Sequence, residues 1–311
     1  MPDQPDISVV LATYNRATSV RRAIASVLAQ EGARFELIVV DDASTDGTRD
    51  YLATLADPRI RVVLAERNLG PSGARNLGLD AAQAEIVAFL DSDDAFRPGR
   101  LAVPLKVFAV DPELVCVLSG AVKFIRAAPR EMPIAAVRLA PAAFEWALIA
   151  DLIPVEATST TVRRAAALAV GGFCETLRLT EDREFLIRLA RKGACRLVPD
   201  LLWEKSWSDD SLSNDWAAAG QGLIAYVAQR PEYRGRFRQL GSYLATKVLV
   251  SHLRNRAPLA FLRDLGRLAA AGLVDANVAR LVRDHRAVSR YRRAMSSEAA
   301  LAALTGPPES L

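Results

Sequence analysis

Apolar and polar positions alternate in blocks over the first hundred residues. Short runs that are apolar at almost every position are separated by stretches with apolar residues at helical spacing. The apolar runs lie at residues 7–12, 35–40, 61–64 and 85–90, and the clearest helical patterns at 20–28 and 71–82. Continuous apolar runs are typical of strands buried on both faces, and strands that alternate with helices form parallel βαβ units. The pattern therefore predicts an α/β protein with a mostly parallel sheet and flanking helices.

The rest of the chain is less regular. Strands are expected at residues 114–119 and 197–199, a loop at 127–141, and a helix at about 181–192 after a break at Gly171-Gly172-Phe173. From about Trp216 onward, leucine, alanine and arginine recur at helical spacing. This spacing predicts a helical C-terminal region.

Polar residues follow three of the predicted strands directly: Thr13-Tyr14-Asn15, Asp41-Asp42 and Asp91-Ser92-Asp93-Asp94. Ligands of open α/β sheets bind at the carboxyl ends of the strands. Carboxylate oxygens suit Mg²⁺ or Mn²⁺, and a metal held by one or two of them keeps positions open for phosphates. In isolation the acidic run would be a solvated turn, but its place beside two other polar strand ends favours a metal and phosphate site. Asp41-Asp42 alone fits either a helix-capping turn or an acceptor for a base or ribose.

Composition and missing motifs exclude several classes of protein. The 311 residues are 51% hydrophobic, which is ample for a large core, yet we find no signal peptide and no apolar run long enough to span a membrane. The three scattered cysteines argue against a disulfide framework or zinc site and fit a reducing cytosol. There is no P-loop and no G-x-G-x-x-G fingerprint. The only histidines, His252 and His285, lie far from the predicted sheet, so a Ser-His-Asp triad there is not expected.

Four blocks of sequence carry a more specific signal. They run from Ser8 to Arg16, Glu36 to Thr48, Asn68 to Asn76 and Phe89 to Asp94. In content, order and spacing they resemble the family 2 glycosyltransferases of the GT-A fold, over residues 6–104 and more weakly to about 213. The resemblance implies a Rossmann-like GT-A domain at 1–215, with a nucleotide-binding half at 1–104 and an acceptor-binding half at 105–215. A helical, basic region at 216–311 would follow it.

The same resemblance assigns roles in nucleotide binding. Tyr14 resembles the residue that stacks on the base, and Asp42 the carboxylate that reads uracil. Asp41 would support that turn, and Arg75 resembles the basic residue near the base and diphosphate. The expected nucleotide-binding set is completed by Thr13, Asn15, Asp91 and Ser92.

The resemblance also implies a metal and a general base. Asp93 matches the last carboxylate of a DxD motif, the direct ligand of Mn²⁺ or Mg²⁺, while Asp91 would touch the metal, its bound water or the ribose. The base of the family comes from a Glu-Asp pair that opens a helix after Gly-Gly-Phe. Asp182 is therefore the candidate base and Glu181 its supporting residue, although by themselves they would be read as an acidic first turn of a helix.

One departure from the family pattern concerns the metal. Many members place a His shortly before Ser-Leu-Ser, whereas residues 207–213 contain none, so that Asp209, Asp210 or a water molecule would take its position. The Gln-x-x-Arg-Trp motif of the polymerising members is also missing, which favours addition of a single sugar. The implied reaction is inverting transfer from a nucleotide sugar, most simply a UDP-sugar, to a glycan or lipid-linked acceptor in polysaccharide biosynthesis.

Two other functions are weighed against this one. A sugar nucleotidyltransferase would carry a Gly-rich, basic loop after the first strand, which Thr13-Tyr14-Asn15-Arg16 does not provide. A non-catalytic nucleotide-sugar-binding protein would be favoured if Asp182 pointed away from the crevice.

The charge of the chain is unevenly distributed. Residues 230–295 hold 15 Lys and Arg against 4 Asp and Glu. Such a surplus fits solvated faces of packed helices, or a surface for anionic membrane lipid or a lipid-diphosphate acceptor. No nucleic acid partner is expected, because no recognised binding motif accompanies the charge. The expected location is the cytoplasm, with peripheral contact at the inner face of the membrane.

Overall fold

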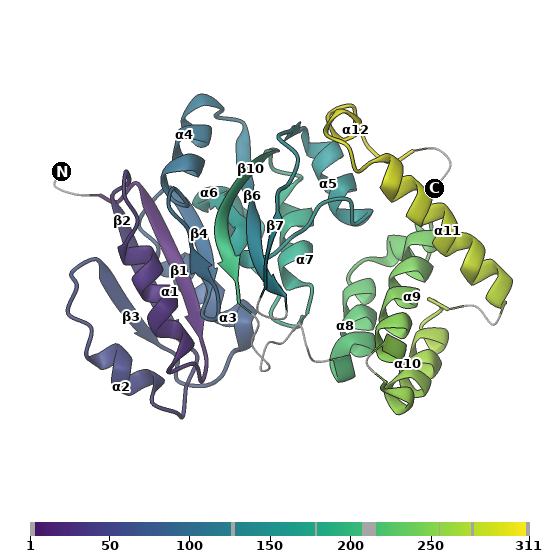
Figure 1. The fold of residues 1–311 in the computed structure, drawn as a ribbon, viewed down its shortest axis with the longest axis horizontal. Coiled ribbons are helices and arrows are strands. Elements are labelled where there is room, and N and C mark those ends of the chain that lie inside the picture. The colour runs from purple at the N-terminus through teal and green to yellow at the C-terminus, as the bar shows by residue number, and fades with distance from the viewer. Residues whose placement is uncertain are drawn as a thin grey trace.

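A single large sheet forms the centre of the protein, with helices on both of its faces and a helical unit at one end (Figure 1). The computed structural model describes residues 4–125, 128–177, 179–206, 216–254, 256–274 and 277–308. The strands are β1 (Ile7–Thr13), β2 (Phe35–Asp41), β3 (Ile60–Leu64), β4 (Ile86–Asp91), β5 (Ala95–Phe96), β6 (Leu114–Ile125), β7 (Ala128–Met132), β8 (Arg138–Leu139), β9 (Thr160–Arg163) and β10 (Ala194–Lys205).

The helices of the α/β part are α1 (Ser19–Leu28), α2 (Thr48–Ala53), α3 (Gly70–Ala81), α4 (Ala102–Val110), α5 (Pro141–Ile149), the short 3₁₀ turn η1 (Ala157–Ser159), α6 (Arg164–Ala169) and α7 (Glu181–Leu189). Those of the C-terminal unit are α8 (Trp216–Ala228), the 3₁₀ turn η3 (Pro231–Tyr233), α9 (Arg238–Arg254), α10 (Pro258–Ala270), α11 (Val278–Ala294) and α12 (Glu298–Ala302). None of the helices in the described residues is both long and apolar enough to cross a bilayer.

The strands are ordered β3-β2-β1-β4-β9-β6-β10-β5, with β7 beside β6 and β8 beside β10. The four N-terminal strands are mutually parallel, as their apolar runs predict. β9 then enters between β4 and β6, antiparallel to both. The predicted fold class, a mostly parallel α/β sheet with flanking helices and a helical C-terminal region, is confirmed.

Alternate residues of each central strand enter two separate cores. Val10 of β1 packs on one face of the sheet with residues of α3, α5 and α7, while Val9 and Leu11 pack on the other with α1 and α4. Strands with both faces covered must be apolar throughout, which explains the runs in the sequence. The first core continues into the C-terminal unit, where it includes Tyr226 and Tyr233.

The loop predicted at residues 127–141 is wrong. This stretch contains β7 and β8, and α5 begins at its end. β7 lies at an edge of the sheet with mostly exposed side chains, so it has no buried face to impose an apolar alternation. β8 is only two residues long, too short for any periodicity.

Candidate active site

The carboxyl ends of β1, β2 and β4 lie side by side at one edge of the sheet. Thr13 is the register partner of Asp41, and Ala12 that of Asp91. The three polar strand ends that the sequence singled out are therefore brought together in space. The crevice outside such strand ends is where open α/β sheets bind their ligands.

The β1 end offers an exposed aromatic ring. Tyr14 is 45% exposed, while its neighbour Thr13 is buried. Asn15 has a left-handed backbone (φ 52°), which asparagine tolerates better than most residues. Its side-chain oxygen accepts a hydrogen bond from the Thr45 backbone N–H (2.8 Å), and its own N–H donates to Ser44 Oγ (2.9 Å). These bonds fix the turn that presents the exposed Tyr14 ring.

The two carboxylates at the β2 end have different surroundings. Asp41 is fully buried and accepts hydrogen bonds from Arg49 Nε (2.6 Å) and the Ser44 backbone N–H (3.1 Å). Asp42 accepts from the backbone N–H groups of Leu69 (2.7 Å) and Gly70 (2.9 Å) at the start of α3. Burial raises the pKa of Asp42 in spite of these bonds. Both side chains therefore hold the turn, and Asp42 also connects it to α3.

The acidic run at residues 91–94 follows β4. Asp94 is buried; its Oδ2 accepts from Thr158 Oγ1 (2.7 Å), and its Oδ1 has no hydrogen-bond partner among the described residues. Burial, with the nearby charge of Asp91, raises the pKa of Asp94 well above its usual range. Ser92 is buried, and the Asp93 carbonyl accepts from Arg22 Nη2 (2.9 Å).

Arg75 joins this run to α7. Its Nη2 contacts Asp91 Oδ1 at 2.6 Å and its Nη1 contacts Glu181 Oε1 at 2.8 Å. Burial works against the charged guanidinium, but the two carboxylates outweigh it and raise the pKa of Arg75. A single side chain therefore places the first residue of α7 beside the end of β4.

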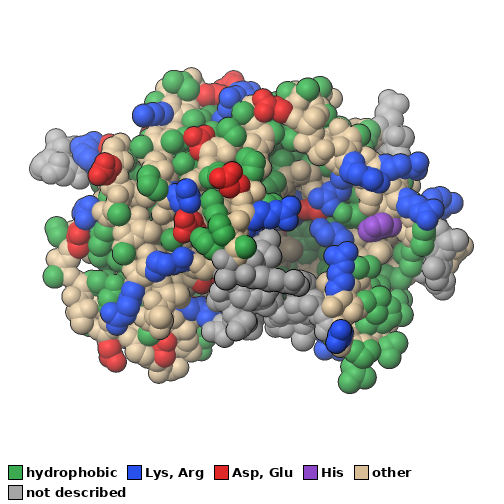
Figure 2. Space-filling model, viewed as in Figure 1, with side chains coloured by type: hydrophobic (Ala, Val, Ile, Leu, Met, Phe, Trp, Pro, Cys, Tyr) green, Lys and Arg blue, Asp and Glu red, His purple; other side chains and the backbone are tan. Residues whose placement is uncertain are grey.

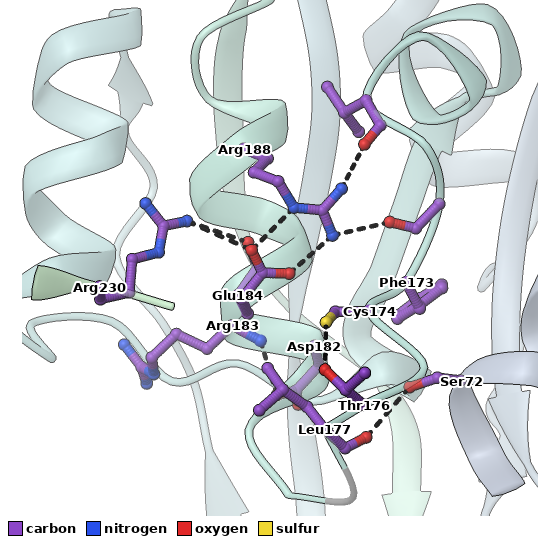
Figure 3. Close-up of polar contacts among 12 residues, drawn as sticks. Ser72, Phe173, Cys174, Thr176, Leu177, Asp182, Arg183, Glu184, Arg188 and Arg230 are labelled. Carbon is purple, nitrogen blue, oxygen red and sulfur yellow. Dashed lines mark hydrogen bonds and ion pairs between the residues drawn. The ribbon is translucent and has the colours of Figure 1, made fainter. Parts of the chain in front are cut away.

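Asp182 lies in the first turn of α7, next to Glu181. Burial, and then the charge of Glu181, raise the pKa of Asp182 to about 7. Its Oδ1 accepts a hydrogen bond from the Arg183 backbone N–H (2.7 Å), as Figure 3 shows. A carboxyl that changes protonation near neutral pH inside a crevice has the property expected of a general base.

The Gly-Gly-Phe segment before α7 is clamped between two helices. Asn76 of α3 donates to the Phe173 carbonyl (3.0 Å) and accepts from its N–H (2.7 Å). The Phe173 ring stacks on Phe185 of α7 with centroids 4.3 Å apart. Arg188 contacts the carbonyls of Val170 and Gly172 while it is held by Glu184 (Figure 3). This clamp fixes where α7 begins.

Three contributors to the site were not anticipated from the sequence. Arg100 is fully buried, where burial lowers its pKa to about 9, and it donates to the carbonyl of Thr158 at 2.8 Å. Thr158 Oγ1 in turn contacts both the Asp91 N–H (3.1 Å) and Asp94. Lys205, at the end of β10, is the third. No motif or sequence periodicity marks any of the three.

The residues present fit an oxygen-seeking divalent cation. Asp94 Oδ1 is a buried carboxylate oxygen without a partner in the described residues, and Asp91 and Asp93 adjoin it. Within those residues no three His, Cys, Asp or Glu side chains form a complete metal cage. An incomplete set of hard ligands is typical of Mg²⁺ and Mn²⁺ sites that share the ion with substrate phosphates. The suggested substitutes Asp209 and Asp210 lie outside the described residues.

This sheet, with polar residues at three adjacent strand ends, has the GT-A architecture, and comparison with known proteins agrees. Residues 8–168 match the family model described as glycosyl transferase family 2. The chain belongs to glycosyltransferase family 2.

Similar proteins include the succinoglycan biosynthesis protein ExoO of Rhizobium meliloti, 52% identical over 97 residues, which are 31% of this chain and 28% of ExoO. The UDP-Glc:alpha-D-GlcNAc-diphosphoundecaprenol beta-1,3-glucosyltransferase WfgD of Escherichia coli is 37% identical over 101 residues, 32% of this chain and 40% of WfgD. These matches therefore span less than half the length of each relative.

Two solved structures share the fold over most of the chain. S. aureus TarS 1–349 in complex with UDP-GlcNAc has a TM-score of 0.64 and 19% identity, covering 93% of this chain and 92% of TarS 1–349. The mannosyltransferase PcManGT of Pyrobaculum calidifontis, in complex with GDP-Man and Mn²⁺, has a TM-score of 0.58 and 22% identity, covering 97% and 86%. Both similarities extend into the helical C-terminal unit.

Proposed function

We propose that the protein transfers one sugar from a nucleotide-diphosphate sugar, most simply UDP-linked, to an acceptor hydroxyl with inversion at the anomeric carbon. The observation that carries this proposal is Asp182, a carboxyl with a pKa of about 7, coupled through Glu181 and Arg75 to the acidic run at the end of β4. A base and a diphosphate site linked in this way are what a single displacement requires.

The steps follow from the groups present. Asp182 accepts the proton of the acceptor hydroxyl, whose oxygen attacks the anomeric carbon from the face opposite the diphosphate. Burial and the charge of Glu181 raise the pKa of Asp182, whereas the charge of Arg75 limits that rise. A divalent cation on Asp93 and Asp91 would neutralise charge on the leaving diphosphate. One displacement with one base inverts the anomeric centre, by the geometric logic known from glycosidases.

The donor site is proposed at the three strand ends. Tyr14 offers a ring for stacking on the base, and Asp42 an acceptor next to it. Thr13, Asn15 and Asp41 hold the two turns, and Ser92 adjoins the proposed metal ligands. UDP-GlcNAc in the TarS complex and UDP-Glc in the name of WfgD favour a uridine nucleotide, while Mn²⁺ in the PcManGT complex favours that metal.

A panel of donors tests the activity. The protein would be incubated with UDP- and GDP-sugars, Mn²⁺ and lipid-diphosphate or glycan acceptors, and released nucleoside diphosphate would be measured. We expect nucleoside diphosphate and a glycosylated acceptor. Release of pyrophosphate with a sugar 1-phosphate as substrate would instead identify a nucleotidyltransferase, and tight donor binding without any turnover would identify a non-catalytic binding protein.

The acceptor is proposed to be lipid-linked, which would place the protein at the cytoplasmic face of a membrane. The support comes from the surface of residues 230–295. Four arginines line one outward hollow on α11, together with Val282: Arg283, Arg286, Arg290 and Arg293. Like charges three and four residues apart destabilise a helix slightly. The only acid of α11, Asp284, is buried and pairs with Arg283 at 3.9 Å, so α11 has no further carboxylate to offset Arg286, Arg290 and Arg293.

Exposed leucines lie on two other helices of the same unit. Leu259 and Leu262 of α10 are 81% and 63% exposed, and Leu253 of α9 is 58% exposed. Figure 2 shows hydrophobic side chains over α10 and basic ones over the upper part of the same end of the molecule. Apolar side chains that enter the headgroup layer, combined with arginines, fit an anionic bilayer better than a soluble polyanion.

Cosedimentation with vesicles tests the membrane contact. Each basic residue near an anionic surface contributes about 1 kcal/mol, so Arg286→Gln with Arg290→Gln should weaken binding to phosphatidylglycerol vesicles roughly 30-fold. The matched control, Lys106→Gln with Lys192→Gln, removes the same charge from exposed sites in the α/β part. Equal binding by both double variants, or no binding by the wild-type protein at low salt, would contradict the membrane contact.

A further inference from the structure

Two lysines share one carboxylate beside the candidate active site. Glu156 precedes η1, and its two oxygens contact the ammonium groups of Lys123 and Lys205, the latter at 2.6 Å. The lysines are register partners on the parallel strands β6 and β10. The two lysines therefore share Glu156 as a partner and lie side by side on adjacent strands. They differ in the other side chains that surround them.

Lys205 lies at the acidic run. β10 pairs antiparallel with β5, so that Trp203 is opposite Phe96 and Glu204 is opposite Ala95. One further step along this register brings Lys205 to the level of Asp94. The next residue, Ser206, accepts a hydrogen bond from Arg22, whose guanidinium also donates to the Asp93 carbonyl.

The electrostatics agree with this placement. Burial opposes the charged ammonium, but Glu156, Asp94 and Asp91 together raise the pKa of Lys205. The same ammonium counteracts the rise in the pKa of Asp94. Lys205 is therefore a permanently charged cation next to the proposed phosphate site.

The negative charge of the acidic run at residues 91–94 would oppose binding of a diphosphate unless a cation offsets it. A nucleoside diphosphate brings further negative charge to a crevice that already holds Asp91, Asp93 and Asp94, and the Arg75 guanidinium is committed to Asp91 and Glu181. The side chain of Lys205 is 31% exposed, and only one of its three N–H donors is needed for Glu156. Lysine commonly binds phosphate as a point charge.

We propose that Lys205 is a diphosphate-binding residue of the donor site, presented by the end of β10, whereas Lys123 only anchors Glu156. The proposal rests on the proposed nucleotide-sugar function, because it needs a diphosphate in the crevice. It adds a side-chain cation to the divalent ion as a second source of positive charge for the leaving group. The end of β10 is also tied to the acidic run through Arg22, which donates to both Ser206 and the Asp93 carbonyl.

Binding of two ligands to three variants tests the proposal. UDP and uridine would be titrated by calorimetry and ligand-observed NMR, with and without Mn²⁺, against Lys205→Met, Lys205→Arg and Lys123→Met. A hydrogen bond to a charged group contributes about 1.5–3 kcal/mol, so Lys205→Met should weaken UDP roughly 10- to 100-fold in both conditions. Uridine binding should not change, and Lys205→Arg should restore part of the loss. Lys123→Met should leave both ligands within about twofold, because Glu156 keeps Lys205 as its partner and no role in ligand binding is assigned to Lys123.

The outcomes distinguish failure of the role proposed for Lys205 from failure of the proposed donor site. An equal loss for UDP and uridine in Lys205→Met would show that Lys205 acts only through Glu156 and the fold, and unchanged UDP binding would show that it does not touch the diphosphate. Either result overturns the role of Lys205 and leaves the proposed transferase intact. If the wild-type protein bound no nucleoside diphosphate at all, the proposed donor site would fail, and the role of Lys205 with it.

Discussion

Asp182 changes protonation close to neutral pH, and the cause is local. Burial and the charge of Glu181 both disfavour its ionised form and bring its pKa to about 7. A base must be ionised to accept a proton, so kcat/KM should rise as the pH increases through about 7 and level off above it. The pH profile of transfer from a UDP-sugar would measure this limb. A rate that stays flat between about pH 5.5 and 8.5 would contradict the assignment.

Replacing the base should remove turnover and spare binding. General-base catalysis contributes about 10²- to 10⁴-fold, so Asp182→Asn should lower kcat by that factor while the Kd for UDP changes little. Asp50→Asn, an exposed acid in the first turn of α2, is the control and should keep full activity. Near-full activity of Asp182→Asn would exclude Asp182 as the base.

The same carboxyl should reduce stability at high pH. Its pKa is higher in the folded chain than the ordinary value of 3.8, so the folded state binds more protons than the unfolded state between these two values. Stability from this group is therefore present at low pH and is lost as the pH rises towards about 7. Asparagine resembles the protonated form, so Asp182→Asn should raise Tm at about pH 8 and have little effect at about pH 4.5. Scanning calorimetry at both pH values would show the difference, and a larger gain at the lower pH would contradict it.

At the scale of elements, the turn after β2 that carries Asp42 depends on the close packing of α3 against β1. A Cβ added at Gly78 would lie 2.2 Å from Val10 Cγ1, on a β-branched side chain that is fully buried in the strand. Val10 cannot move aside without disturbing the core, so only glycine allows α3 to lie this close. The same helix begins at the N–H groups held by Asp42 and carries Arg75.

Two glycine substitutions should therefore change the free energy of unfolding in opposite directions. Gly78→Ala should destabilise the protein by about 1–3 kcal/mol through overpacking against β1. Gly266→Ala, in α10, meets no atom within 4 Å and should stabilise by about 0.5–1 kcal/mol through helix propensity. Urea unfolding would give both values. Adding Val10→Ala should recover part of the Gly78→Ala loss, and equal effects of the two glycine substitutions would contradict the close approach.

The elements that the sequence predicts are those whose burial leaves a regular pattern of apolar residues along the chain. The strands β1, β2 and β4 are buried on both faces and appear as apolar runs. β3 also appears as an apolar run although it is a partly exposed edge strand, and α1 and α3 show helical spacing. α5 is buried on most sides, so it lacks an amphipathic period, and β9 is a four-residue strand inserted antiparallel between distant partners. In the site, Asp42, Asp91 and Asp182 follow from strand ends and from the family resemblance. Arg100, Thr158 and Lys205 become visible only when β5, η1 and β10 are placed together.

At the scale of the whole molecule, the C-terminal unit is joined to the α/β part by buried contacts. Tyr233 is fully buried, and its hydroxyl donates to the Ile149 carbonyl at the end of α5 (2.8 Å). Trp146 of α5 donates to Tyr291 of α11 (2.7 Å), and Asp151 forms ion pairs with Lys247 and Arg292. The division at residues 215 and 216 stays a prediction of sequence organisation. Because one hydrophobic core includes both sides, the two parts should unfold together.

The buried thiols of the sheet can report on this coupling. Cys116 and Cys195 are fully buried in β6 and β10, and Cys174, which is partly exposed, would be replaced by serine. Removing a large buried aromatic side chain costs about 3–5 kcal/mol. If unfolding is cooperative, Tyr233→Ala in the C-terminal unit should speed labelling of the two sheet thiols roughly 100-fold or more, since each 1.4 kcal/mol is a factor of about ten. Leu259→Ala, which truncates a side chain that is 81% exposed in the same unit, should leave the rate unchanged. Unchanged thiol labelling in Tyr233→Ala, alongside early loss of helical signal, would mean that the C-terminal unit opens independently of the sheet.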